Sequence, residues 1–257
     1  MVKFAFFVLL LGSTALYSFD SALSMSTDTT RFDYAERSTN NTLLDTETNN
    51  FGEITGFSFS LDPRYNGFYA NTSYAYGNTN YIGGTHTNST YGSHTTTTQN
   101  SIFDTSYGYK FTQFIDENTY IPYHFGLGYR AWLREIKSTS TVSGYDELYE
   151  WQYATIGIGF HTRLSSNIDL GFETSYKMAF DAQMYDNWYG NTYHLQNVYG
   201  YTLSVPFEYK FNHSWSAFAI YNYEFWNISA SNAINGYYEP DSETKNETLS
   251  VGFKYYF

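Results

Sequence analysis

The segment 168–180 separates its side chains by parity along its whole length. Its large apolar residues are all even-numbered, and its charged residues, Asp169, Glu173 and Lys177, are all odd-numbered. Successive side chains of a β-strand point to opposite faces, whereas the period of a helix would mix the two kinds of residue around its surface. This pattern predicts a strand with one apolar face and one charged face.

The chain also ends on an alternating segment, 249–257, whose last residue is Phe257. Terminal residues of soluble domains usually fray into water, whereas the closing strand of a bacterial outer-membrane barrel commonly ends on an aromatic residue. At the other end, the apolar run 4–11 followed by small residues is typical of a secretory signal peptide. We expect a signal peptide over residues 1–22, with cleavage between about residues 16 and 23, and one barrel domain over residues 23–257.

The composition separates a membrane barrel from a bundle of membrane helices. After the N-terminal run, the chain has no apolar stretch near the roughly 18 residues that a spanning helix needs, and its mean hydropathy is −0.45. Its aromatic fraction is nevertheless 22%, with 29 Tyr and 22 Phe. A barrel accounts for both values, because only alternate residues face lipid and aromatic girdles border the membrane.

Two further counts exclude whole classes of site and partner. The chain has no Cys, which excludes disulfides and thiolate metal sites. Its formal net charge of −12 argues against nucleic acid as a partner. We predict no cofactor and no metal site.

Alternation bounded by turn residues predicts an all-β, antiparallel up-and-down barrel of about ten strands. The strands are 31–37, 51–61, 68–76, 103–111, 121–133, 154–163, 168–180, 203–211, 215–226 and 249–257. Tight turns at 62–66, 114–118, 165–167 and 212–214 alternate with long polar loops at 38–50, 78–100, 135–150, 182–196 and 228–246. In outer-membrane barrels the short turns are periplasmic and the long loops extracellular.

The inward parity of these strands carries charges of both signs. Buried charges persist only when they are paired and hydrogen-bonded, and a wide water-filled channel needs about 16 strands. We therefore expect a lumen filled by ion pairs rather than a pore. The predicted lumen network comprises Arg130, Arg134, Asp169, Glu173, Lys177, Glu208 and Lys210, and the inward set also includes Arg31, Asp33 and Arg37.

From about residue 118 to the C-terminus, the order of strands, turns and loops resembles that of the omptins, which are ten-stranded outer-membrane endopeptidases with five extracellular loops. The segment 172–177, Phe-Glu-Thr-Ser-Tyr-Lys, leads into a loop with Asp186-Asn187, as in the approach to the fourth omptin loop. The resemblance implies a catalytic pattern at the barrel mouth. In omptins this pattern is an Asp-x-Asp pair after the third strand and an Asp-x-His dyad in the fourth loop.

The matching positions at the barrel mouth are Asn78, Asn80, Asp186 and Trp188. Amides therefore stand in place of the carboxylate pair, and Trp stands in place of the His. A neutral amide cannot take up a proton at pH 7, and the Trp indole only donates hydrogen bonds. A shifted alignment brings His194 into the dyad but leaves the acid pair missing. We therefore predict no catalytic residues.

We expect a non-enzymatic barrel in the outer membrane of a Gram-negative bacterium, exposed at the cell surface. Its polar, Tyr-, Asn- and Thr-rich loops would serve surface interaction or a structural role, because loops held by a rigid scaffold carry function and this composition suits recognition. The alternative is an omptin-like endopeptidase with a rearranged catalytic site. The expected partners are outer-membrane lipid and lipopolysaccharide around the barrel and an extracellular ligand at the loops, with no nucleic acid. The barrel is expected to be monomeric.

Overall fold

The computed structural model describes residues 21–85 and 88–257. The predicted signal peptide falls almost entirely on residues 1–20, outside the described residues. Within the described ranges the regular structure is entirely β-strand: β1 (Ser21–Arg37), β2 (Leu43–Thr48), β3 (Ile54–Pro63), β4 (Gly67–Gly83), β5 (His94–Phe114), β6 (Thr119–Ile136), β7 (Tyr145–Arg163), β8 (Ile168–Asp186), β9 (Asn191–His194), β10 (Val198–Lys210), β11 (Trp215–Ile228) and β12 (Asp241–Tyr256). No helix among the described residues is long and apolar enough to cross a membrane.

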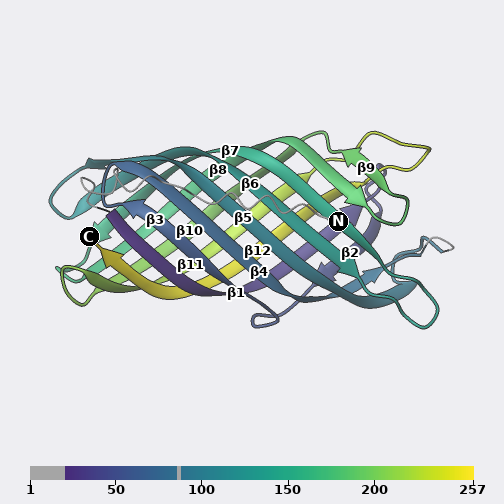
Figure 1. Ribbon diagram of the computed structural model, residues 1–257, viewed down its shortest axis with the longest axis horizontal. Helices are drawn as coiled ribbons and strands as arrows, with labels where there is room; N and C mark the ends of the chain where they lie inside the picture. The colour runs from purple at the N-terminus through teal and green to yellow at the C-terminus, as the bar shows by residue number, and fades with distance from the viewer. Residues whose placement is uncertain (1–20, 86–87) are drawn as a thin grey trace.

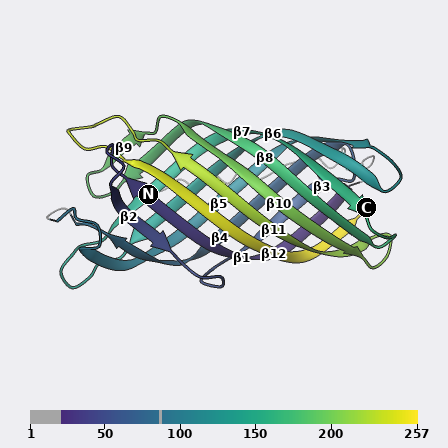
Figure 2. The ribbon, with the colours of Figure 1, turned by 180° about the vertical axis from the view of Figure 1, so that it is seen from behind.

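The strands form one antiparallel sheet that closes on itself, as Figures 1 and 2 show from opposite sides. β12 pairs with β1 along nearly its whole length, which completes the ring. β2 and β3 follow one another along β1, and β9 and β10 follow one another along β8, so the twelve strands occupy ten positions around the barrel. The predicted ten-stranded up-and-down barrel is confirmed. Tight turns lie at one end, which we call the turn end, and the longer connections lie at the opposite loop end (Figure 1).

The strand position that follows β1 differs from its prediction. The sequence predicts one strand there, 51–61, whereas β2 and β3 share the position and β2 lies within the predicted loop 38–50. Between β2 and β3 the ladder along β1 is interrupted, and the side chain of Asn49 fills the gap. Its oxygen accepts a hydrogen bond from Phe32 N at 2.5 Å, and its amide nitrogen donates to Thr30 O at 3.0 Å. A side-chain amide thus satisfies backbone groups that a strand would otherwise satisfy.

Several strands also extend farther toward the loop end than predicted, so the loops are shorter. β8 continues beyond position 180 through a β-bulge at Asp181, where φ is 51° and the register with β7 shifts. The extra residue changes the parity of the strand. As a result Ala182 and Met184 are buried in the lumen.

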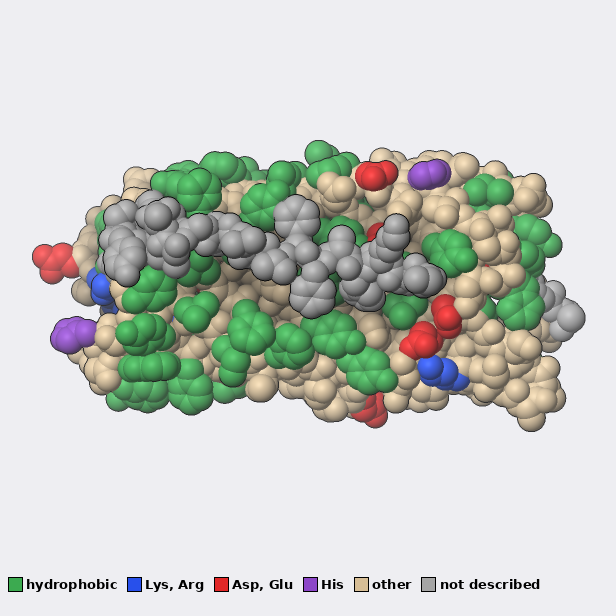
Figure 3. Space-filling model, viewed as in Figure 1, with side chains coloured by type: hydrophobic (Ala, Val, Ile, Leu, Met, Phe, Trp, Pro, Cys, Tyr) green, Lys and Arg blue, Asp and Glu red, His purple; other side chains and the backbone are tan. Residues whose placement is uncertain are grey.

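An apolar band encircles the half of the barrel next to the turn end. Figure 3 shows hydrophobic side chains gathered over this half. In the described chain, the outward positions of the band carry no Asp, Glu, Lys or Arg; the band comprises residues 23–29, 55–61, 68–76, 103–113, 121–129, 152–162, 168–180, 199–209, 215–225 and 249–255. At its border toward the loop end, the hydroxyls of Tyr129 and Tyr221 donate to Glu150 and Glu247. An uncharged band with aromatic borders is what membrane-crossing strands require.

Beyond the band, the barrel continues toward the loop end with mostly polar outward faces (Figure 3). Here the prediction that Arg31, Asp33 and Arg37 face the lumen is wrong. They lie on the outward parity of β1, where Arg31 pairs with Asp33 at 3.5 Å and with Glu247 at 3.3 Å. Outward side chains in this part of the barrel contact water rather than lipid, so charges are tolerated there and parity no longer separates charged from apolar residues.

Candidate functional site at the loop end

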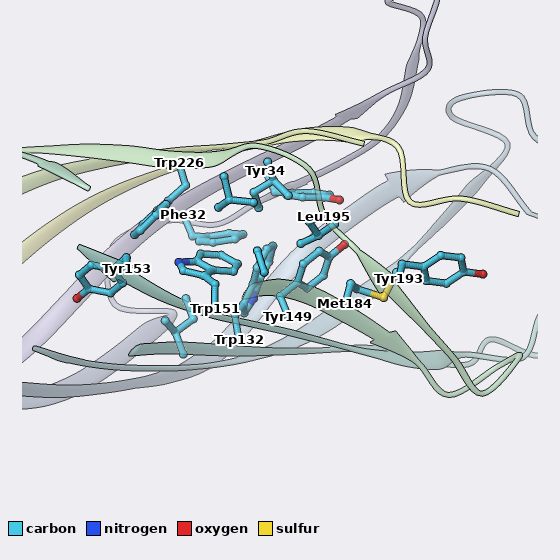
Figure 4. Close-up of a cluster of buried hydrophobic side chains, with 14 of the residues drawn as sticks. Phe32, Tyr34, Trp132, Tyr149, Trp151, Tyr153, Met184, Tyr193, Leu195 and Trp226 are labelled. Carbon is cyan, nitrogen blue, oxygen red and sulfur yellow. The ribbon is translucent and has the colours of Figure 1, made fainter. Parts of the chain in front are cut away.

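Aromatic side chains fill the lumen where the barrel leaves the apolar band. They are Phe32, Tyr34, Trp132, Tyr149, Trp151, Tyr153 and Trp226, which we call the aromatic plug (Figure 4). Trp132 stacks on Tyr149 with 4.8 Å between ring centroids, and Trp151 packs against Trp226 at 5.0 Å. None of these side chains is more than 2% exposed. Rings packed at this density leave no route for solute through this level of the lumen.

Between the plug and the turn end, the lumen holds a cavity of about 520 Å³. Most of the predicted lumen network lines this cavity: Arg130, Asp169, Glu173, Lys177, Glu208 and Lys210. The structure brings these residues together in separate groups, each with partners of opposite charge or an aromatic ring. Within the described ranges, no group of three or more His, Asp or Glu side chains is arranged to hold a metal ion.

The largest of these groups lies directly against the plug. Arg130 pairs with Asp104 at 3.1 Å and with Glu224 at 2.9 Å, and Lys177 reaches Glu224 at 2.6 Å. The hydroxyl of Tyr153, a plug residue, donates to Asp104 at 2.6 Å. Two cations and two carboxylates therefore balance where the polar lumen contacts the aromatic rings.

A second group is centred on His161, which lies between two of the predicted network residues. Its Nδ1 is 3.1 Å from Asp169, and its Nε2 is 2.8 Å from Glu173. The Tyr120 hydroxyl donates to Asp169 at 3.0 Å. Both imidazole nitrogens are thus occupied by carboxylates, which fixes the ring rather than leaving it for chemistry.

The last two residues of the predicted network that line the cavity, Glu208 and Lys210, lie closest to the turn end. Glu208 pairs with Lys254 at 3.0 Å. Lys210 lies over the ring of Tyr256, with its Nζ 6.0 Å from the ring centroid. These contacts complete a cavity wall of balanced charge.

Arg134 lies apart from the other predicted network residues, on the loop-end side of the plug. Its guanidinium pairs with Glu147 and, at 2.7 Å, with Glu47, and it lies 4.1 Å from the ring centroid of Tyr34. Asp45 is farther away at 3.9 Å. Arg134 and Glu47 are completely buried, so this is a charge cluster beyond the membrane band with no direct contact to water at its centre.

Two more carboxylates complete an acidic cluster of Glu36, Asp45, Glu47, Glu147 and Glu239. Glu239 enters it from the loop between β11 and β12 and accepts a hydrogen bond from the Tyr149 hydroxyl. Burial, reinforced by Glu239 and Glu147, raises the pKa of Glu36 to about 8. Burial likewise raises the pKa of Glu239 and of Asp45 above the ordinary range. One arginine cannot balance five carboxylates, and with a pKa of about 8 Glu36 holds its proton at neutral pH.

The four predicted positions at the barrel mouth are not brought together. Asn78 and Asn80 are exposed on β4, whereas Asp186 is buried at the end of β8, and these strands are not neighbours in the sheet. The Asp186 carboxylate accepts hydrogen bonds from the backbone nitrogens of Trp188 at 2.6 Å and Tyr189 at 3.3 Å. Asp186 therefore fixes the turn that follows β8.

Aromatic rings gather at the loop end, on two connections and at the start of β7. Tyr145 and Trp188 form a T-shaped pair with centroids 6.3 Å apart, and Tyr189 stacks on Tyr237 at 4.5 Å. We call these four residues the aromatic row. Trp188, Tyr189 and Tyr237 are 45%, 40% and 48% exposed, which is unusual for rings already packed on one another. Sequence reasoning considered Trp188 only as a failed catalytic match and missed the row, because its members come from the start of β7 and from two separate connections.

Arg134→Met should destabilise the barrel by roughly 3–5 kcal/mol at pH 7.5, because it leaves Glu47 and Glu147 buried without a countercharge. At pH 5 the loss should be smaller, because burial raises the pKa of Glu147 and favours its protonated form there. Urea unfolding of the refolded protein in lipid vesicles measures both values. The matched control is Arg31→Met, whose exposed ion pairs are worth at most about 1 kcal/mol. Equal losses for the two variants would contradict this assignment.

Glu36→Gln should flatten the dependence of stability on pH between about 4.5 and 8. Over this range the unfolded chain loses the Glu36 proton while the folded barrel, with a pKa of about 8, retains it. The free energy of unfolding of the wild type therefore falls as pH rises, and the glutamine variant lacks this contribution. Unfolding midpoints at pH 5, 7 and 9 test the prediction, with Glu117→Gln in a tight turn as control. A variant that follows the wild-type slope would show that Glu36 is ionised in the folded state.

No protein-family model and no curated protein sequence matches the chain. Among solved structures, it is similar to the outer-membrane protease OmpT of Escherichia coli, with 12% sequence identity, a TM-score of 0.55, and coverage of 95% of this chain and 100% of OmpT. The transport unit of the Escherichia coli autotransporter AIDA-I gives 11% identity and a TM-score of 0.45 over 97% of this chain and 94% of that one. The attachment invasion locus protein Ail of Yersinia pestis gives 11% identity and a TM-score of 0.36 over 93% and 99%. At these identities a likeness shows the fold alone. The chain is an antiparallel β-barrel of the bacterial outer membrane.

Proposed function

We propose that the protein is a non-enzymatic surface-recognition barrel, whose loop end binds an extracellular ligand. The observation that carries the proposal is the aromatic row, a set of packed yet exposed rings at the tip of a barrel that projects beyond the membrane band. Exposed aromatic clusters on monomeric proteins mark interaction sites. Tyr and Trp also provide large contact areas while losing little conformational entropy.

The closed lumen supports this proposal over a channel. The aromatic plug lies between the cavity and the loop end, and its rings are almost completely buried. A solute entering the cavity from the periplasm would have to displace Trp132, Trp151 and Trp226 to pass. The function is therefore assigned to the outer surface rather than to the interior.

The placement of the carboxylates favours recognition over peptide hydrolysis. A hydrolytic site needs a general base within hydrogen-bond reach of a water molecule. The oxygens of Asp186 accept backbone hydrogen bonds from the following turn, and Glu47 and Glu147 are both engaged by Arg134. These contacts give each carboxylate a structural role.

We also propose that lipid and lipopolysaccharide surround the apolar band and that the barrel works as a monomer. Its outward face is uncharged over the whole band. The pairing of β1 with β12 leaves no free sheet edge that would call for a second copy.

Replacing residues 233–238, which include Tyr237 and Tyr238, by Gly-Gly should abolish binding while leaving the barrel folded. The pairing of Ser231 with Glu239 at the base of the loop is retained in this variant. Bacteria displaying the wild type, the trimmed variant or no barrel are compared for adherence to eukaryotic cells, other bacteria and polysaccharide-coated surfaces. The control shortens residues 139–142 in the loop between β6 and β7. Wild-type adherence no greater than that of cells without the barrel, or full adherence of the trimmed variant, would refute the proposal.

Wild-type protein should show no discrete conductance in planar bilayers, because the plug fills the lumen. Trp151→Ala/Trp226→Ala should conduct, since the two substitutions remove rings that are packed 5.0 Å apart at the centre of the plug. The variant also verifies that protein has inserted. Discrete openings of the wild type would show that the lumen is a pore.

A further inference from the structure

We infer that the aromatic row is a platform for neutral carbohydrate, which stacks the faces of pyranose rings on Trp188, Tyr189 and Tyr237. The inference rests on the proposed function and names the class of ligand. Pyranose rings present C–H groups with partial positive charge, and these pack against the electron-rich faces of aromatic rings. Trp188 and the stacked pair of Tyr189 and Tyr237 are exposed on fixed backbone at the outer tip of the barrel, where the pair has one face of each ring covered by the other ring.

The turn that carries Trp188 and Tyr189 is held rigidly to the neighbouring strand. Asn187 N donates to Asp146 O at 3.1 Å, and Asp146 N donates to the Asn187 side-chain oxygen at 2.8 Å. The Asn187 amide also donates to the Asp146 carboxylate at 2.8 Å. Together with the bonds from Asp186, these contacts hold the backbone under both rings without involving the rings themselves.

The loop that carries Tyr237, on the other side of the aromatic row, is also fixed by its own contacts. Ile234 and Tyr237 exchange two backbone hydrogen bonds at 2.7 and 3.0 Å around Asn235-Gly236. Asn235 and Gly236 have φ of 54° and 85°, the left-handed pair that a tight type I′ turn requires. Two residues beyond Tyr237, the side chain of Glu239 is buried in the acidic cluster. The loop is thus fixed at its tip by a turn and at its base by a buried carboxylate.

The chemistry around the row suits an uncharged polyhydroxylated ligand. The two segments that supply the exposed rings, 187–194 and 230–238, contain no Asp, Glu, Lys or Arg, although the whole chain has a net charge of −12. Their remaining side chains include Asn187, Asn191, Thr192 and Asn232, whose amides and hydroxyl can donate to and accept from sugar hydroxyls. Within these two segments a strongly charged partner would find no complementary charge, whereas rings flanked by amides offer both kinds of contact that a sugar makes.

The test is ligand-observed saturation-transfer NMR on the refolded full-length barrel in lipid nanodiscs. The probes are cellohexaose, maltohexaose and laminarihexaose as neutral glycans and a heparin fragment as a charged one. Wild-type protein should bind at least one neutral hexasaccharide and not the heparin fragment. Tyr189→Ala/Tyr237→Ala should weaken that binding by about tenfold, as expected for the loss of two stacking rings. Tyr189→Phe/Tyr237→Phe should keep it, because the rings remain.

Tyr91→Ala is the matched control, since it removes an exposed loop-end tyrosine outside the row. No binding of any neutral glycan to the wild type, or equal binding by the double alanine variant, would overturn the inference. Preferential binding of the heparin fragment would overturn it as well. A protein ligand lost on trimming residues 233–238, with no glycan bound, would refute the carbohydrate class while leaving the recognition function intact.

Discussion

The structure depends on one constraint, which is that backbone groups inside a membrane must be hydrogen-bonded within the protein. Closure of the ring between β1 and β12 meets this constraint. The register shifts and strand breaks of the described sheet lie outside the apolar band: the break filled by Asn49, the shift between Glu36 and Arg37, the bulge at Asp181 and the break before β10. Water and side chains can satisfy the backbone there. The strand register is therefore continuous through the band, where pairing is interrupted at Pro122 and Pro206 without a shift, and the projecting part is free to vary.

This division explains why the two halves of the lumen differ. Within the band, small and charged side chains leave a polar cavity whose ion pairs are matched one against another. In the projecting part, outward side chains contact water, and the lumen becomes the only place for a hydrophobic core. The aromatic plug is that core, and it joins Phe32 on β1 to Trp226 on β11. The barrel thus resembles a membrane protein in one half and a soluble β-protein in the other.

How much of the structure could be predicted from the sequence also differs between the band and the projecting part. Alternation identified the strands of the band, because lipid admits only apolar residues on alternate positions. The inward placement of Arg130, Glu173 and Lys177 follows from the same rule. The rule fails at Arg31 and Asp33, where water replaces lipid outside the barrel. It also gives no signal for Trp188 stacking beside Tyr145, or Tyr189 on Tyr237, because those contacts depend on how separate loops meet and not on any period along the chain.

The acidic cluster links the buried core to the outer surface. Tyr149 belongs to the plug, and its hydroxyl donates to Glu239, which lies two residues beyond Tyr237 of the aromatic row. Burial raises the pKa of Glu36 and Glu239, so proton binding by these groups stabilises the folded cluster. Five carboxylates around one arginine are therefore a poor source of stability at alkaline pH. In acidic to neutral surroundings the protonated carboxyl groups and the ion pairs of Arg134 form a hydrogen-bonded anchor that positions exposed rings at the tip of a closed barrel.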